Sequence, residues 1–173
     1  MPDLRTNSNR LSELFTFIKG REGVLDYFYV DNMGYVTVGI GTLVDAKGND
    51  INKGLTVLRQ VLAAAPGVQF LNKKTKQPVS AREIEADWVK VKTAYLAAKA
   101  SGTSIPERKY KDIADLVLAP GANYLFWKTE VFKAISEMYK QRPDAQGLDE
   151  YIQMALVDVR YNPAGVNPFY TGE

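Results

Sequence analysis

Two carboxylates and one hydroxyl occur near the start of the sequence at a spacing that could support acid–base chemistry. Glu22 is followed after eight residues by Asp31, and Asp31 after five more by Thr37. The chain of 173 residues has no histidine and no cysteine. Acid–base catalysis must therefore fall to Asp, Glu, Lys or Tyr, and cysteine nucleophiles and thiolate metal sites are excluded. One protonated and one ionised carboxyl group are what hydrolysis of a glycosidic bond requires.

Glu22 lies at the end of a segment with helical periodicity, residues 10–23. Apolar side chains recur there at the spacing of one helix face: Leu11, Leu14, Phe15 and Ile18. An N-cap is available at Asn7, Ser8 or Asn9. Glu22 continues the apolar stripe into the last turn, where burial and the negative end of the helix dipole both favour a protonated carboxyl group. The alternative is that Glu22 frays outward beside Arg21.

The other two candidates belong to a predicted β-hairpin. LDYFYV (25–30) and YVTVGIG (35–41) have strand character, and DNMG (31–34) is typical of a turn. Alternation along the second strand would place Tyr35, Thr37, Gly39 and Gly41 on one face. Two glycines inside a strand indicate a close approach, so this face is expected to form an open floor with Asp31 at its rim. The simpler alternatives are that Asp31 only stabilises the turn and that Thr37 is an ordinary β-branched strand residue.

Residues 21–42, REGVLDYFYVDNMGYVTVGIGT, resemble the catalytic region of the phage T4-type lysozyme family. The resemblance implies that Glu22 is the general acid, that Asp31 is the base or electrostatic stabiliser, and that Thr37 positions the attacking water. It also implies that a glycan chain runs past the hairpin and contacts Tyr35, Gly39 and Gly41. A shorter stretch, ALVDVRYNPAG (155–165), is similar to a second segment of the same family.

The activity implied by this resemblance is that of a peptidoglycan hydrolase. Such an enzyme cleaves the β-1,4 bond between N-acetylmuramic acid and N-acetylglucosamine, here with inversion and without a cofactor or metal. Inversion requires the two carboxyl groups to lie about 6.5–9.5 Å apart. The alternative is a non-catalytic glycan-binding or structural module, for example in a phage tail or a secretion apparatus. A complete set of acid, base and hydroxyl favours the enzyme.

The rest of the chain is expected to be mainly helical, which makes the fold class α+β. Helices are predicted over residues 52–64, from a capping box at Ser80 and Glu83 onward, and over 111–119, 123–140 and 148–162. By resemblance, residues 1–173 form one lysozyme-like domain, with a catalytic lobe over 1–51 and a helical lobe over 52–173. Members of the family continue with further helices, so the helical lobe is expected to be incomplete at its C-terminal end.

Composition limits the partners. A net charge of +2 is too small to indicate a nucleic-acid surface, and no stretch has the length of a membrane span. The start, MPDLRTNSNR, lacks the apolar region of a signal peptide. The expected partners are peptidoglycan glycan strands and, for an injected toxin, an immunity or inhibitor protein. The chain would be made in the cytoplasm and act on the cell wall after release or delivery, as an endolysin, a tail lysozyme or a toxin.

Overall fold

The computed structural model describes residues 3–161, apart from the side chains of residues 22 and 158–161. The chain divides into two compact units. One is the continuous segment Gly23–Phe126, and the other joins the residues up to Glu22 with those from Trp127 onward. This division differs from the lobes expected to meet at residue 51, because the first long helix packs with the last one. The mixed α+β class expected from the sequence is confirmed.

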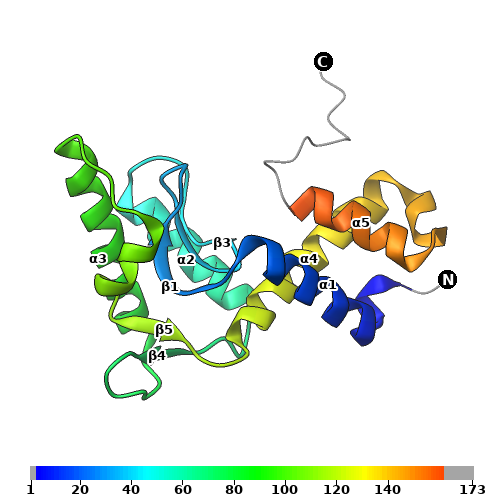
Figure 1. Ribbon diagram of the computed structural model, residues 1–173, viewed down its shortest axis with the longest axis horizontal. Coiled ribbons are helices and arrows are strands. Elements are labelled where there is room, and N and C mark those ends of the chain that lie inside the picture. Colours follow the sequence, from blue (N-terminus) through cyan, green and yellow to red (C-terminus); the bar gives the residue numbers. More distant parts are fainter. Residues whose placement is uncertain (1–2, 162–173) are drawn as a thin grey trace. The chain divides into compact units, whose positions relative to one another are not determined.

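The segment Gly23–Phe126 contains the predicted hairpin (Figure 1). Strands β1 (Leu25–Val30), β2 (Val36–Gly39) and β3 (Thr42–Leu43) form an antiparallel sheet in the order β1-β2-β3. The pairing of β1 with β2 is irregular between Leu25 and Tyr29. The predicted second strand is too long at its end, because β2 stops at Gly39 and a short turn leads into β3.

A second small sheet was not expected. Strands β4 (Phe70–Asn72) and β5 (Leu116–Leu118) pair antiparallel, with Leu71 opposite Val117. The helix predicted over 111–119 is therefore wrong: a 3₁₀ helix, η2 (Glu107–Asp112), precedes β5. Short apolar runs fit a buried strand as well as a helix, and here pairing with β4 decides the outcome.

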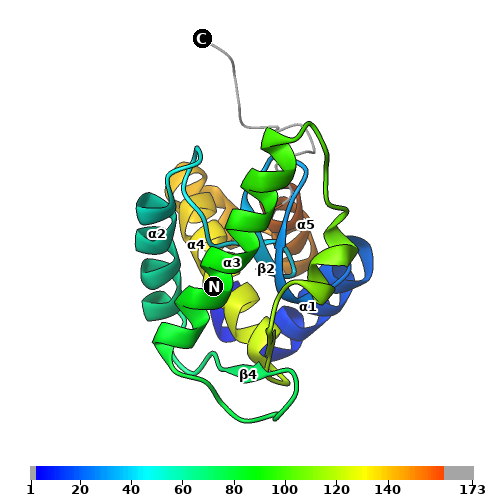
Figure 2. The same cartoon turned by 90° about the vertical axis from the view of Figure 1, so that its left-hand side faces the viewer.

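Two helices complete this unit. The predicted helices at α2 (Ile51–Ala64) and α3 (Ala81–Ala100) are confirmed, and Ser80 and Glu83 form the expected capping box on α3. Helix α3 packs on β1, β2 and α2, and Figure 2 shows it crossing in front of the hairpin strands. Trp88 is fully buried and donates from Nε1 to the carbonyl oxygen of Val44, which ties α3 to the residues after β3.

The other unit is helical. It contains η1 (Leu4–Thr6), α1 (Ser8–Glu22), the part of α4 (Ala122–Gln141) from Trp127 onward, η3 (Pro143–Gly147) and α5 (Glu150–Tyr161). Helix α1 packs on α5 and η1.

The helices predicted in this unit are confirmed as far as residue 161, and the last four residues of the family-like segment 155–165 lie outside the described residues. The side chain of Asn7 caps α1 by accepting from the Arg10 amide at 3.2 Å. The predicted apolar face of α1 is buried at Leu11, Leu14 and Ile18. No helix among the described residues is long and apolar enough to span a membrane.

Candidate functional site

Asp31 is held in the hairpin turn by main-chain donors. Its Oδ1 accepts from the amides of Met33 and Tyr35, both at 2.9 Å. The turn is closed by hydrogen bonds from the Gly34 amide to the Asp31 carbonyl and from the Asp31 amide to the Tyr35 carbonyl, both at 3.0 Å. Gly34 has a φ of +88°, which its position in the turn requires and which favours glycine. The simple role of Asp31 in stabilising the turn is thus confirmed, and it fixes the carboxylate.

Thr37 reaches the other oxygen of the same carboxylate. Its Oγ1 lies 3.3 Å from Asp31 Oδ2 and 3.2 Å from the Tyr35 carbonyl oxygen, so its single hydroxyl hydrogen is shared between two acceptors. Asp31 is half-buried and Thr37 is only 3% exposed. The structure therefore brings together two of the three predicted catalytic residues. It leaves Asp31 with one oxygen held by the main chain and one turned towards a hydroxyl.

Glu22 is the last residue of α1, as the sequence predicts, and Gly23 follows with a φ of +74°. A left-handed glycine directly after the last helical residue is a common way to end a helix. The Glu22 side chain lies outside the described part of the structure. Its distance from Asp31, and its role as the acid, remain predictions.

The two glycines of the hairpin have a conformational reason to be there. Gly39 and Gly41 have φ values of +69° and +68°, a region that other residues rarely adopt. Gly41 lies in the turn after β2, so the expectation that one flat strand face carries Thr37, Gly39 and Gly41 is wrong. Gly39 is buried, whereas Gly41 is exposed with no atom within 4 Å of where its β-carbon would be. Contact of either glycine, or of Tyr35, with substrate remains a prediction.

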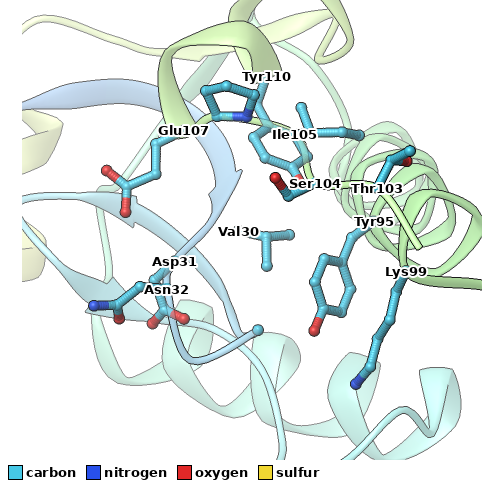
Figure 3. Close-up of a pocket in the computed structure, with 12 residues that line it drawn as sticks. Val30, Asp31, Asn32, Tyr95, Lys99, Thr103, Ser104, Ile105, Glu107 and Tyr110 are labelled. Atoms are coloured by element: carbon cyan, nitrogen blue, oxygen red, sulfur yellow. The ribbon is translucent and has the colours of Figure 1, made fainter.

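A pocket of about 370 Å³ opens beside Asp31 (Figure 3). Asp31, Asn32 and Gly34 form its hairpin side, and the opposite wall comes from α3 and the segment leading into η2. In Figure 3, Tyr95 and Lys99 lie across the pocket from Asp31. The pocket lining therefore includes two carboxylates, those of Asp31 and Glu107, and one ammonium group, that of Lys99, which lies across the pocket from Asp31.

The wall from α3 and η2 was missed by sequence reasoning. Tyr95 and Lys99 are one helical turn apart, and the Lys99 ammonium lies 5.6 Å from the centre of the Tyr95 ring. Burial raises the pKa of Tyr110, another lining residue, to about 12. The spacing of Tyr95 and Lys99 is visible in the sequence, but nothing there places them beside Asp31.

The described residues contain no group of three or more His, Cys, Asp or Glu that could hold a metal ion. The chemistry available at Asp31 is that of a fixed carboxylate, which can orient a water molecule and accept its proton. Comparison of the chain with protein-family models, curated proteins and solved structures found no match.

Proposed function

We propose that this protein is a peptidoglycan hydrolase of the lysozyme type, with Glu22 as general acid, Asp31 as general base and Thr37 as the residue that orients the attacking water. The observation that carries the proposal is the pairing of Asp31 Oδ2 with the Thr37 hydroxyl at 3.3 Å. The main-chain donors on Oδ1 fix the direction of the carboxylate, and a fixed base is what an inverting glycosidase requires.

The proposed reaction is a single displacement. A water molecule held by Asp31 and Thr37 gives a proton to Asp31 Oδ2 as its oxygen bonds to the anomeric carbon of the muramic acid residue. The bond from that carbon to the bridging oxygen breaks at the same time, and Glu22 donates a proton to this leaving oxygen. The product therefore has the opposite anomeric configuration, and each carboxyl group returns to its starting state by exchange with solvent.

The position of Glu22 also supports the role of acid. The last turn of a helix carries a partial negative charge that disfavours a second negative charge. The fold that we propose is lysozyme-like, and the substrate is the glycan strand of a bacterial wall, reached after release or delivery of the protein.

The test is hydrolysis of a purified peptidoglycan suspension, followed by loss of turbidity. Glu22→Gln should lower the rate by about two orders of magnitude or more, because it removes the proton donor at constant size. Glu13→Gln is the matched control: Glu13 lies on the same helix, where it pairs with Arg10 at 2.7 Å, and its loss should leave the rate unchanged. Proton NMR of the first product should show the inverted anomer.

Two results would contradict this proposal. A Glu22→Gln variant with the wild-type rate would exclude Glu22 as the acid. A wild-type protein that binds peptidoglycan without cleaving it would instead support the non-catalytic glycan-binding module.

A further inference from the structure

A fully buried ion pair lies behind the hairpin turn. Lys92, in the middle of α3, places its ammonium 2.7 Å from Asp45 Oδ2, and both side chains are 0% exposed. Removing two opposite charges from water costs much of what their attraction returns, and well-packed apolar residues often replace such a pair without loss of stability. Stability alone is therefore a weak reason for this pair.

The two charged groups also bind the main chain of the turn. Lys92 Nζ donates to the carbonyl oxygens of Gly34 at 3.2 Å and of Gly48 at 3.4 Å. Asp45 Oδ2 accepts from the Val36 amide at 3.0 Å. The ion pair thus fixes one main-chain group on each side of Tyr35.

Tyr35 is the residue whose main chain holds the candidate base. Its amide donates to Asp31 Oδ1, and its carbonyl accepts from the Asp31 amide and from the Thr37 hydroxyl. A segment of three residues therefore has both ends fixed by Lys92 and Asp45 and its centre bonded to Asp31 and Thr37.

We infer that Lys92 and Asp45 are positioning residues for Asp31, an inference that rests on the proposed function of Asp31 as a base. None of the hydrogen bonds given above joins Lys92 or Asp45 directly to Asp31 or Thr37. The two residues act through the main chain of residues 34–36. An apolar pair could fill the same space, but it would leave the Gly34 carbonyl and the Val36 amide without these charged partners. This explains why charged groups occupy a buried place.

The packing of Gly34 agrees with this role. A β-carbon on Gly34 would collide with the hydroxyl of Tyr95, one turn beyond Lys92 on α3. The Lys92 ammonium lies 5.5 Å from the centre of the same ring. Helix α3 therefore supports the turn at Gly34 through both a hydrogen bond and a close contact.

The informative variant is Lys92→Met with Asp45→Asn in the full chain. Met keeps most of the volume of lysine, and Asn keeps an oxygen acceptor for the Val36 amide, so no unpaired charge is left buried. The control is Lys90→Met with Asp115→Asn, which by the same substitutions removes an exposed pair at 2.6 Å between Lys90 on the same helix and Asp115, the residue before β5. The single variant Lys92→Met is unsuitable here, because it leaves Asp45 buried and unpaired.

Three quantities are measured: thermal unfolding, exchange of the Met33 and Tyr35 amide protons by NMR, and kcat and KM on soluble peptidoglycan fragments. In the Lys92/Asp45 variant we expect about tenfold faster exchange at both amides, since one hydrogen bond from a charged donor is lost. We expect kcat to fall about 10- to 100-fold with KM nearly unchanged, because a displaced base slows the reaction without weakening binding. The control should match the wild type in all three.

The outcomes separate the inference from the function on which it rests. A folded Lys92/Asp45 variant with wild-type kcat, or with unchanged exchange at both amides, overturns the inference and leaves the proposed function in place if Glu22→Gln is inactive. An equal fall of kcat in the control variant also overturns it. A wild-type chain that hydrolyses no peptidoglycan overturns the proposed function and this inference with it.

Discussion

The side-chain oxygen of Asn123 occupies the space that a β-carbon on Gly39 would need. Both residues belong to the unit Gly23–Phe126. This oxygen is buried and has no hydrogen-bond partner among the described residues. The close approach indicated by a glycine at position 39 is thus made by the protein itself. Gly41 is different, because its surroundings are open and only its φ favours glycine.

Gly39→Ala should therefore destabilise the protein more than Gly41→Ala. Both substitutions place a side chain on left-handed backbone, which costs about 1–2 kcal/mol. Gly39→Ala must in addition displace Asn123. Denaturant unfolding of the two variants measures the difference, and an equal or greater loss at Gly41 would contradict this reading. If Gly41→Ala slows hydrolysis by the folded protein, Gly41 is a substrate contact.

Thr37→Val and Thr42→Val form a matched pair on neighbouring strands, β2 and β3, of the same sheet. Both threonines are buried, but Thr37 hydrogen-bonds to Asp31, whereas the Thr42 hydroxyl has no partner among the described residues. We expect Thr37→Val to lower the hydrolysis rate about 10- to 100-fold, since a water loses one of its two orienting groups.

Thr42→Val should leave the rate unchanged and raise the free energy of unfolding by about 1 kcal/mol, because it removes an unpaired buried hydroxyl. Rate assays and denaturant unfolding of both variants give the comparison. Equal effects of the two substitutions on the rate would rule out a specific role for Thr37.

Lys92→Met alone should destabilise the protein by about 3–5 kcal/mol, because the Asp45 carboxylate stays buried without its partner. Adding Asp45→Asn should recover most of the lost stability. Thermal or denaturant unfolding of the single and double variants measures the recovery. If the second substitution restores nothing, the loss comes from packing and not from the unpaired charge.

Asp87 makes stability depend on pH. Burial raises the pKa of its carboxyl group above the ordinary value of 3.8, and hydrogen bonds from the Asp115 and Leu116 amides oppose this only in part. The folded protein therefore binds this proton more tightly than the unfolded chain does. The contribution of Asp87 to the free energy of unfolding is most favourable below pH 3.8 and declines as the pH rises through the raised pKa.

Asp87→Asn should remove this dependence. The free energy of unfolding of the wild type minus that of the variant should fall as the pH rises from about 4 to about 7. Taking this difference removes the contribution of the other titrating groups, which are the same in both proteins. Denaturant unfolding at several pH values measures it. A difference that rises with pH would mean that the main-chain donors outweigh burial.

Local patterns in the sequence were sufficient to predict the α-helices and the hairpin, but they also predicted a helix over 111–119, where the structure has the end of η2 and strand β5. The end of α1 at Glu22 follows from an apolar stripe and a glycine, and the start of α3 follows from the capping box at Ser80 and Glu83. The pairing of β4 with β5 could not be predicted in this way. Its partners are more than forty residues apart, and the three-residue runs carry no periodicity of their own.

In the candidate site, too, the contacts within one local segment could be predicted, and those with a distant helix could not. Asp31 and Thr37 were identified because they lie on one hairpin, where local geometry brings them together. The pocket wall at Lys99 and the buried support from Lys92 were missed, because both depend on how α3 packs against the turn. A lysine within a predicted helix gives no sign of whether it faces solvent or a buried aspartate.

The helical unit is built from two segments that are far apart in the sequence, and this affects how the chain folds during synthesis. The segment Gly23–Phe126 is continuous and can close its own core once it has left the ribosome. Helix α1 is made first, yet its partner α5 is made more than a hundred residues later. The apolar face of α1 that includes Leu11, Leu14 and Ile18 cannot be covered by α5 during that interval. A nascent chain arrested before α5 should therefore expose this face to chaperones, although the unit Gly23–Phe126 has already folded.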